Sequence, residues 1–480
     1  MLGLAVLAIN RGPLFYFDSA GYFLQGNGIL SFFEPKVSGG EGAVDGAAGG
    51  TAAEEDDGDA IISRSPVYAL IIAAAWNAGA LVLANIANLV AVFAAAALLA
   101  RALVRNVPVA MSALTLTSAP IAFAAMTSLS FYVAYVMPDT FIGIAILLTA
   151  ALAAFSQHMR PWEIILAFLL LAFALIVHRS HLLIILLTVP FAVIGAIIAA
   201  GRRGWIAAGL MGLALIVGVV EIKSYSFAAQ EVAGKAVTLP PFLTARIIED
   251  GPGYVYLQEN CPEIEIATCA LAEALTWSDD PFRITAAHIA FEHSEQLGSF
   301  RLMTIEDQRK VSAEQHAFYL RVFAAYPLDV IAAVLRNTLI QTTDVSIRMT
   351  IPTDVTMEMV RRTTANDAIL AGPLAANRDW IASVDRVHEI VYIVSILAIL
   401  VLLVLPGRTS KQVRVFAGLV VIGILVNAFV CGAVSQPAPR YGARVAWLLP
   451  FIASLLALVA FAPRLAKEPS TLHAKAEPAE

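Results

Sequence analysis

Charge is scarce in this chain. Only 14% of its 480 residues are charged, whereas a soluble domain carries about 25%. The sequence also lacks the ligand spacing of a zinc site, a phosphate-binding glycine loop and a nucleophile elbow. None of the short loops between its apolar segments is long enough for an ATPase. These absences exclude a water-soluble protein and any process driven by nucleotide hydrolysis on this chain.

The chain is rich in apolar residues, which make up 59% of the sequence. Runs of 18 or more such residues are typical of membrane helices. The first run is overlong and is expected to break near Asn77-Ala78-Gly79, before the true span. The sequence therefore predicts an all-α polytopic membrane protein with about 9–10 transmembrane helices. The expected spans lie near 67–103, 107–127, 138–156, 162–178, 181–200, 205–222, 387–405, 413–434 and 444–462.

Lysine and arginine are concentrated in every second short loop, and such loops face the cytoplasm. These loops hold Arg101, Arg105, Arg160, Arg202, Arg203, Arg408, Lys411, Arg414, Arg464 and Lys467. The alternate loops are then expected outside. Four parts follow: an N-terminal transmembrane core at 1–222 with a first outer loop at 11–65, an extracytoplasmic region at 223–386, C-terminal transmembrane helices at 387–464 and a cytoplasmic tail at 465–480.

Two N-terminal segments depart from the pattern of spans. Met1–Ile9 is apolar but far shorter than the roughly 20 residues that cross a membrane, and it lacks the basic start of a signal peptide. We expect the chain to begin inside its first helix, and a short interfacial anchor is the alternative. Segment 38–60 combines small residues with acidic ones, which favours solvated disorder over a metal site.

The stretch 223–386 is the one sizeable polar region, and it is expected to be mainly helical. Thr304 and Asp307 have the spacing of a capping box before a helical run through about Ala325. Tyr326-Pro327 should break that run, and Asp329 should start a second helix. The apolar face of the second helix suits packing along a membrane or on other helices.

The chain has only three cysteines. Cys261 and Cys269 fall in the polar region, and Cys431 falls in a predicted span. Oxidising conditions outside the cytoplasm favour a disulfide between the first two. Two unpaired buried thiols are the alternative.

Polar residues at the ends of apolar runs are the candidates for a functional site, because charge is costly there. Asp18, Asp139 and Arg440-Tyr441 all fall on the side that the loop charges place outside. Each has a structural alternative. Asp18 is then a solvated loop residue, Asp139 caps the next helix, and Arg440 is an interfacial anchor.

The order of these motifs resembles that of the GT-C membrane glycosyltransferases, which include protein mannosyltransferases and the aminoarabinose transferases of lipid A. The resemblance covers most of 11–222 and 435–462 and is weak over 223–386. The motifs that carry it are Phe17-Asp18-Ser19-Ala20-Gly21-Tyr22, Arg64-Ser65-Pro66-Val67-Tyr68, Met137-Pro138-Asp139, Arg179, Arg440-Tyr441 and Leu448-Leu449-Pro450.

The resemblance implies a sugar transferase of the bacterial inner membrane with an extracytoplasmic active face. Its donor would be a polyprenyl-phosphate sugar, and its acceptor a lipid, glycan or protein. By residue, Asp18 matches the catalytic base, and Asp139 matches a second acid that positions acceptor or metal. Arg179 and Arg440 match the residues that hold the lipid phosphate. Further substrate-binding candidates are Tyr22, Arg64, His178 and Tyr441.

The sequence departs from the family at two places. Ser19 follows Asp18 where some relatives have a second acidic residue, and Arg64-Ser65 precedes the proline where some have a glutamate. These departures leave the metal ligands unknown and a divalent cation an open alternative. No other cofactor and no nucleic acid are expected; the bilayer is the expected partner.

Three other functions fit parts of the pattern. An O-antigen polymerase or ligase also has many spans, outer arginines and a late outer loop, but it would not need the early Asp18 loop. A transporter or flippase of envelope lipids would show paired halves, and no such repeat is present. The last alternative is a structural scaffold. Substitution of Asp18 would not change the function of a scaffold, whereas a transferase would lose activity.

Overall fold

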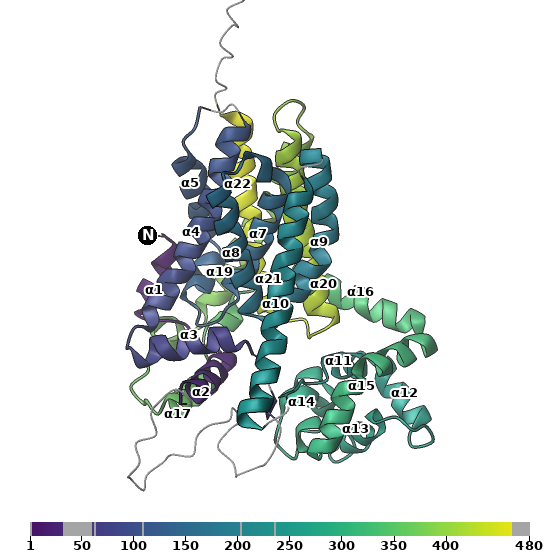
Figure 1. The fold of residues 1–480 in the computed structure, drawn as a ribbon. Helices are drawn as coiled ribbons and strands as arrows, with labels where there is room; N and C mark the ends of the chain where they lie inside the picture. The colour runs from purple at the N-terminus through teal and green to yellow at the C-terminus, as the bar shows by residue number, and fades with distance from the viewer. Residues whose placement is uncertain are drawn as a thin grey trace, which may run out of the picture.

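The structure, a computed structural model, is built almost wholly of helices (Figure 1). It describes residues 2–31, 60–61, 64–107, 110–201, 204–234 and 237–462. The strands of this part are β1 (Ala60–Ile61) and β2 (Val237–Thr238), which form a short parallel pair. The acidic segment 38–60 lies outside the described residues apart from Ala60. The chain is an all-α polytopic membrane protein.

Seven helical segments in the described part are long and apolar enough to cross a membrane. They are α4 (Leu81–Asn106), α7 (Thr140–Phe155) with η2 (Ser156–His158), α9 (Arg179–Ala200), α10 (Gly204–Ala233), α19 (Trp380–Val404), α20 (Lys411–Ala433), and α21 (Pro439–Ala446) with α22 (Leu448–Phe461). One bent helix pair would raise this number to eight, compared with the predicted count of about 9–10. Two expected spans are helices of 13 and 16 residues, α5 (Ala113–Ala125) and α8 (Pro161–Ile176).

The predicted break in the first apolar run is confirmed. Helix α3 (Pro66–Asn77) ends where expected, and Gly79 adopts a φ of 65°, which glycine takes without strain. Two other boundaries were wrong: the span expected from 387 begins at Trp380, and the one expected from 444 begins at Pro439. Both helices start in polar sequence, so hydropathy alone places their starts too late.

Helix α7 is the centre of the bundle, since all 16 of its residues are buried. Helices α4, α8, α9 and α20 pack around it. Gly143 of α7 makes room for the indole of Trp447, which a Cβ atom at that position would meet at 2.5 Å. This close approach holds the junction of α21 and α22 against the central helix.

The bundle has two chemically different ends. At one, which we call the basic end, the buried carboxylate of Glu163 accepts hydrogen bonds from Arg101 and Arg105. Ser410 donates to Asn106 at the same end, so the loops that carry Arg105 and Lys411 lie together, whereas 202–203 and 463–480 lie outside the described residues. The other, which we call the site end, carries η1 (Leu2–Leu4), α1 (Ala5–Asn10), α2 (Phe17–Ser31), α3 and α6 (Leu129–Ala134).

The polar region divides into two parts with different cores. The first, which we call the side domain, has a core of its own and lies beside the site end (Figure 1). Its helices are α11 (Phe242–Glu249), α12 (Pro252–Asn260), α13 (Thr268–Ala274), η4 (Pro281–Ile284), α14 (Ala286–Phe291), η5 (Phe300–Leu302) and α15 (Ile305–Ala325). The second part packs on the membrane bundle. It contains η6 (Arg348–Thr350), α17 (Asp354–Thr364) and α18 (Pro373–Ala376).

Helix α15 begins and ends as the sequence predicted. The Thr304 hydroxyl accepts a hydrogen bond from the backbone N–H of Asp307 at 3.2 Å, and the helix ends at Ala325. Helix α16 (Pro327–Thr343) starts two residues before the expected Asp329, because proline is favoured in the first helical turn. The two helices meet at an angle of 113°.

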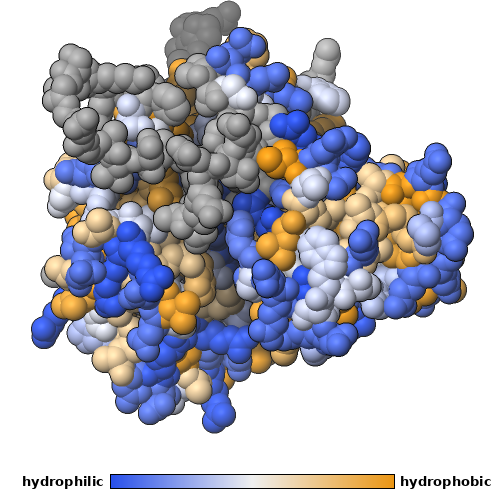
Figure 2. Space-filling view, turned by 90° about the horizontal axis from the view of Figure 1, so that it is seen from below, coloured by the Kyte–Doolittle hydropathy of each residue, from blue (hydrophilic) through white to orange (hydrophobic). Residues whose placement is uncertain are grey.

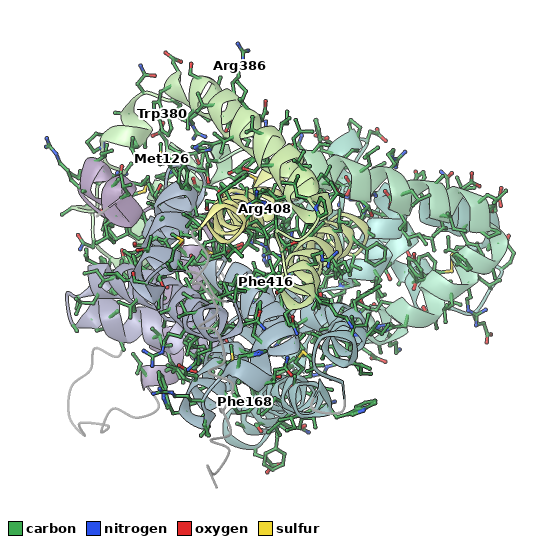
Figure 3. The ribbon with its side chains drawn as sticks, turned by 90° about the horizontal axis from the view of Figure 1, so that it is seen from above. Met126, Phe168, Trp380, Arg386, Arg408 and Phe416 are labelled. Atoms are coloured by element: carbon green, nitrogen blue, oxygen red, sulfur yellow. A yellow bond between two sulfur atoms is a disulfide. The ribbon has the colours of Figure 1, made fainter. Side chains whose placement is uncertain are left out.

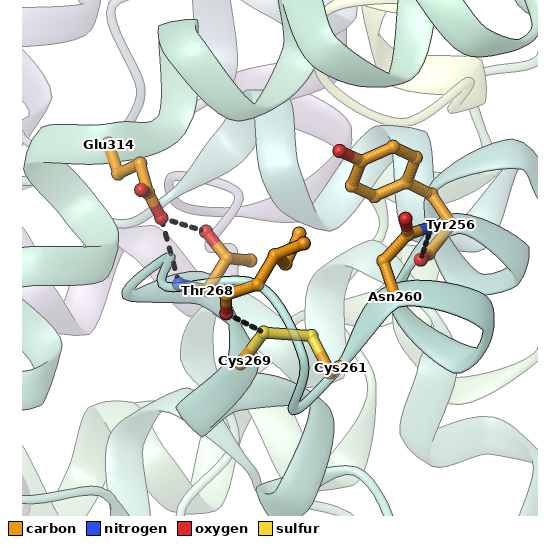
Figure 4. Close-up of a disulfide and its surroundings, with 7 residues drawn as sticks. Tyr256, Asn260, Cys261, Thr268, Cys269 and Glu314 are labelled. Carbon is orange, nitrogen blue, oxygen red and sulfur yellow. Dashed lines mark hydrogen bonds between the residues drawn. A yellow bond between two sulfur atoms is a disulfide. The ribbon is translucent and has the colours of Figure 1, made fainter.

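The disulfide expected between Cys261 and Cys269 is present in the structure (Figure 4). Next to it, Thr268 donates from its backbone N–H and its hydroxyl to Glu314, at 2.8 and 2.7 Å. These bonds tie the start of α13 to α15. The third cysteine, Cys431, is a buried free thiol in α20.

Candidate functional site

The Asp18 carboxylate bridges two arginines from distant parts of the chain. Its Oδ1 accepts a hydrogen bond from Arg64 Nη2, and its Oδ2 accepts one from Arg440 Nη1, each at 2.9 Å. Burial raises the pKa of Asp18, but the two guanidiniums outweigh it and hold that pKa well below its ordinary value. Asp18 is therefore ionised at neutral pH. Its side chain remains 34% exposed, so a substrate can reach it.

Local sequence explains how Arg64 reaches Asp18. Ser65 caps α3 by accepting a hydrogen bond from the Tyr68 N–H, and its hydroxyl donates to the Ile176 carbonyl at 2.6 Å. Arg64 is thereby fixed at the start of α3. Its guanidinium crosses α2 at Gly21, where a Cβ atom would lie 2.2 Å from Arg64 Cζ. Glycine three residues after Asp18 is thus required for this ion pair.

Arg440 is held more tightly than Arg64. Its guanidinium lies between the rings of Tyr16 and Tyr441, at 4.6 and 4.8 Å from their centroids. The Tyr132 hydroxyl donates to the Arg440 carbonyl at 2.5 Å. The Nε atoms of Arg440 and Arg64 are buried and have no hydrogen-bond acceptor among the described residues. These two N–H groups therefore keep unused hydrogen-bonding capacity inside the cluster.

Asp139 forms a second, fully buried ion pair with Arg444, at 3.1 Å. Although Asp139 occupies the N-cap position of α7, its side chain makes no capping hydrogen bond, so the capping interpretation was wrong. Its Oδ2 has no partner among the described residues. Asn427 accepts from Arg444 at 3.2 and 3.0 Å and donates to the Tyr441 carbonyl at 2.8 Å.

The sequence reasoning missed Arg444. It lies one helical turn after Arg440 on α21. The Tyr441 ring contacts both guanidiniums, because its centroid lies 4.8 Å from Arg440 Cζ and 4.9 Å from Arg444 Cζ. The available signal was the four-residue spacing of two arginines in an apolar segment, because such a pair lies on one face of a helix. Helix α21 therefore connects the Asp18 pair to the Asp139 pair.

The histidines at the start of α9 form a neutral border to this cluster. His178 caps the helix, accepting a hydrogen bond from the Ser180 N–H at 3.2 Å, and its ring stacks on His181 at 4.9 Å. Burial lowers the pKa of His178, so its imidazole is uncharged at neutral pH. Arg444 Nη2 reaches the Ser180 hydroxyl at 3.5 Å.

The remaining predicted site residues lie at the edge of the cluster. Tyr22 is buried, and its ring packs edge-on against Tyr68 at 4.9 Å, which indicates a role in joining α2 to α3. Arg179 interacts electrostatically with Glu221 and Tyr225 of α10 and with Tyr22 of α2. The structure thus brings Asp18, Arg64, Arg440, Tyr441 and Asp139 together and places Arg179 toward α10. Cys261 and Cys269 belong to the side domain.

Residues that could hold a metal ion do not converge in the described part of the chain, where no group of three or more His, Cys, Asp or Glu side chains has suitable spacing. The carboxylates of Asp18 and Asp139 are each neutralised by arginine instead. The described residues therefore offer no set of ligands for the divalent cation that the sequence left as an open alternative.

The site opens on the face opposite the basic end. Helix α17 packs on α2, and the Tyr135 hydroxyl donates to the Met349 carbonyl at 3.1 Å, so the 344–379 segment borders the site. Figure 2 shows this face hollowed between the part around α2 and α17 on the left and the side domain on the right.

The arrangement combines a carboxylate, two guanidiniums with free donors and two aromatic rings at the end of the membrane bundle. Guanidiniums bind phosphate with paired hydrogen bonds, and a carboxylate can accept a proton from a hydroxyl. No protein-family model, curated protein or solved structure matches the chain.

Proposed function

We propose that this chain is a GT-C-like membrane glycosyltransferase that moves a sugar from a polyprenyl-phosphate donor to a hydroxyl of a lipid, glycan or protein. The observation that carries the proposal is the Asp18 carboxylate between Arg64 and Arg440. Carboxylate and phosphate are recognised by the same planar donors of arginine. A site at the membrane boundary lets the lipid chain stay in the bilayer while its head group reacts.

The chemistry needs one base and one anion site. The acceptor oxygen attacks the anomeric carbon, the bond from that carbon to the phosphate oxygen breaks, and the phosphate leaves with the electron pair. Asp18 takes the acceptor's proton, while Arg440 and Arg64 stabilise the charge that develops on the phosphate.

Phosphate binding and base strength are coupled in this arrangement. While both arginines hold Asp18, its pKa is low and it is a weak base. A lipid phosphate competes for the same guanidinium donors, and each donor that it takes from Asp18 removes one cause of the lowered pKa. The base is therefore strengthened when donor is bound.

Arg444 and Asp139 have a positioning role in this mechanism. Arg444 contacts the ring that stacks on Arg440, and its charge is balanced by Asp139 inside the protein. A fully buried pair of this kind holds α21 against α7 in one register. Arg440 is thereby presented to the phosphate without rearrangement.

Binding of the lipid phosphate tests this proposal directly. Arg440→Ala should weaken binding of undecaprenyl phosphate to the purified protein by about tenfold or more, because a charge-assisted hydrogen bond contributes about 1.5–3 kcal/mol. The affinity of Arg440→Lys for undecaprenyl phosphate should lie between those of Arg440→Ala and the native protein, since lysine keeps the charge but loses the planar fork. Microscale thermophoresis with undecaprenol as the uncharged competitor measures the phosphate contribution.

The matched control for this test is Arg321→Ala, which removes an exposed arginine of α15 in the side domain. It should bind undecaprenyl phosphate like the native protein. Equal affinity of the Arg440→Ala and native proteins would show that this arginine does not hold the phosphate, and the proposal would fail.

We also propose that the protein lies in a bacterial inner membrane with the basic end in the cytoplasm and the site end outside. The excess of lysine and arginine at the basic end supports this orientation. The disulfide in the side domain also supports this orientation, because disulfides persist in the oxidising compartments outside the cytoplasm.

Labelling of single cysteines in intact cells tests the orientation. An impermeant maleimide should label Asp279→Cys in the side domain and leave Lys411→Cys at the basic end unlabelled until the cells are opened. Both positions are exposed, so accessibility depends on the side of the membrane. The reverse pattern would contradict the orientation.

A further inference from the structure

Helix α16 has three faces of different character. One is buried and consists of Val330, Ala333, Asn337 and Gln341. A second is polar and exposed. The third, which we call the α16 stripe, is apolar and exposed: Leu328, Ile331, Leu335 and Leu339, with exposed fractions of 78%, 44%, 65% and 67%. Spacings of three and four residues place these four side chains along one side of the helix.

The side domain leaves most of the stripe uncovered. Arg336 and Asn337, the two residues after Leu335, both donate to Asp250 of the side domain, at 3.4 and 2.7 Å. Leu335 and Leu339 remain exposed, so the side domain does not cover them. Ile331 and Leu335 border the side domain across a groove, and Leu328 and Leu339 are the most exposed residues of the stripe.

Close packing fixes α16 at the level where the spans end. A Cβ atom at Gly432 of α20 would lie 2.6 Å from the Asn337 carbonyl oxygen. Gln341 donates to the Ala438 carbonyl at 3.1 Å and accepts from the Ala438 N–H at 2.9 Å. Figure 1 shows α16 running nearly perpendicular to the spans, with the side domain below it. From above, in Figure 3, α16 projects to the right of the spans, and none lies over it.

An apolar groove joins the stripe to the membrane surface of the spans. It has a volume of about 250 Å³ and lies between α11 and α15 of the side domain, α16 and the end of α20. Ile331 and Leu335 line it from α16, and Phe429 lines it from α20. Phe429 continues into Leu425, whose side chain is 48% exposed on the membrane-spanning part of α20. The stripe, the groove and the lipid-facing side of α20 therefore form one apolar surface.

We propose that α16 lies in the plane of the membrane boundary at the site end, with the α16 stripe in the hydrocarbon of the adjoining leaflet. Amphipathic helices with one apolar and one polar face bind bilayers in this way. The occupant is a lipid chain and not a protein, because the surface is continuous with the lipid-facing side of a span. The side domain is then held against the bilayer beside the site. This inference does not depend on the proposed function.

Fluorescence quenching in nanodiscs tests the placement. Leu335→Cys and Leu339→Cys, labelled with bimane, should lose about half of their fluorescence when the phospholipid chains carry bromine, as expected for a side chain in the hydrocarbon. Both residues are exposed, so the substitutions leave the core intact. Lys310→Cys, on the polar surface of α15, is the matched control and should not be quenched.

Two results would overturn the inference. Bimane at Leu335→Cys that emits as in water, like Lys310→Cys, would show that the stripe is solvated. Emission shifted to the blue without quenching by bromine would show that a protein surface, such as a second copy of the chain, covers the stripe. The unsubstituted protein sets the labelling background, because its free cysteine is buried.

Discussion

Turnover of the Asp18→Asn variant should fall by about 10²-fold or more, because a positioned general base contributes about 10²–10⁴-fold. Asparagine keeps the size of the side chain but cannot accept a proton at neutral pH. Binding of undecaprenyl phosphate should be retained or strengthened, since the carboxylate that competes for Arg64 and Arg440 loses its charge. The measurement is sugar transfer from a panel of radiolabelled polyprenyl-phosphate sugars in reconstituted membranes.

Asp354→Asn provides the matched control. Asp354 also lies in the first turn of a helix at the site end, but it is exposed on α17. Its variant should transfer sugar at the native rate. Near-normal turnover of the Asp18→Asn enzyme would rule out the base, and loss of lipid-phosphate binding together with turnover would show that Asp18 is structural.

Removing the Arg444 guanidinium should have the largest effect on stability. Arg444→Met leaves the Asp139 carboxylate buried without a counterion, and breaking such a pair costs about 3–5 kcal/mol. Adding Asp139→Leu to this variant should restore much of the loss, because neither charge then remains in the interior. Thermal unfolding in detergent measures both effects.

Transfer activity separates positioning from stability in this pair. The double variant should unfold nearly like the native protein and still transfer sugar poorly, because Tyr441 and Arg440 lose the contact that orients them. A surface pair provides the comparison: Arg362→Ala, which separates Arg362 from Glu358, should change stability by less than about 1 kcal/mol. Full activity of the stable double variant would refute the positioning role.

Elements with local signals were predictable from sequence. The break after α3 follows from Gly79, which takes the left-handed conformation that ends a helix. The start of α15 follows from the Thr304 hydroxyl, and the elbow after it follows from Pro327. In each case one or two residues determine the backbone, so no knowledge of distant neighbours is needed.

Partners were not predictable in the same way. Asp18 was selected because it is a polar residue after an apolar stretch, but its bonds to Arg64 and Arg440 depend on how three helices pack. Arg444 was missed because it is the first residue of the span expected near 444–462, and the distant carboxylate that balances its charge cannot be found from hydropathy.

The ion pair between Asp18 and Arg440 also bears on how the protein is made, because 422 positions separate the two residues. The chain is synthesised from its N-terminus, so the carboxylate is in place long before the arginine emerges from the ribosome. A chain that stops before α21 contains Asp18 and Asp139 but lacks Arg440 and Arg444, which balance their charges. The cluster of carboxylates and arginines is therefore completed only when α21 has been synthesised and has packed against α2 and α7.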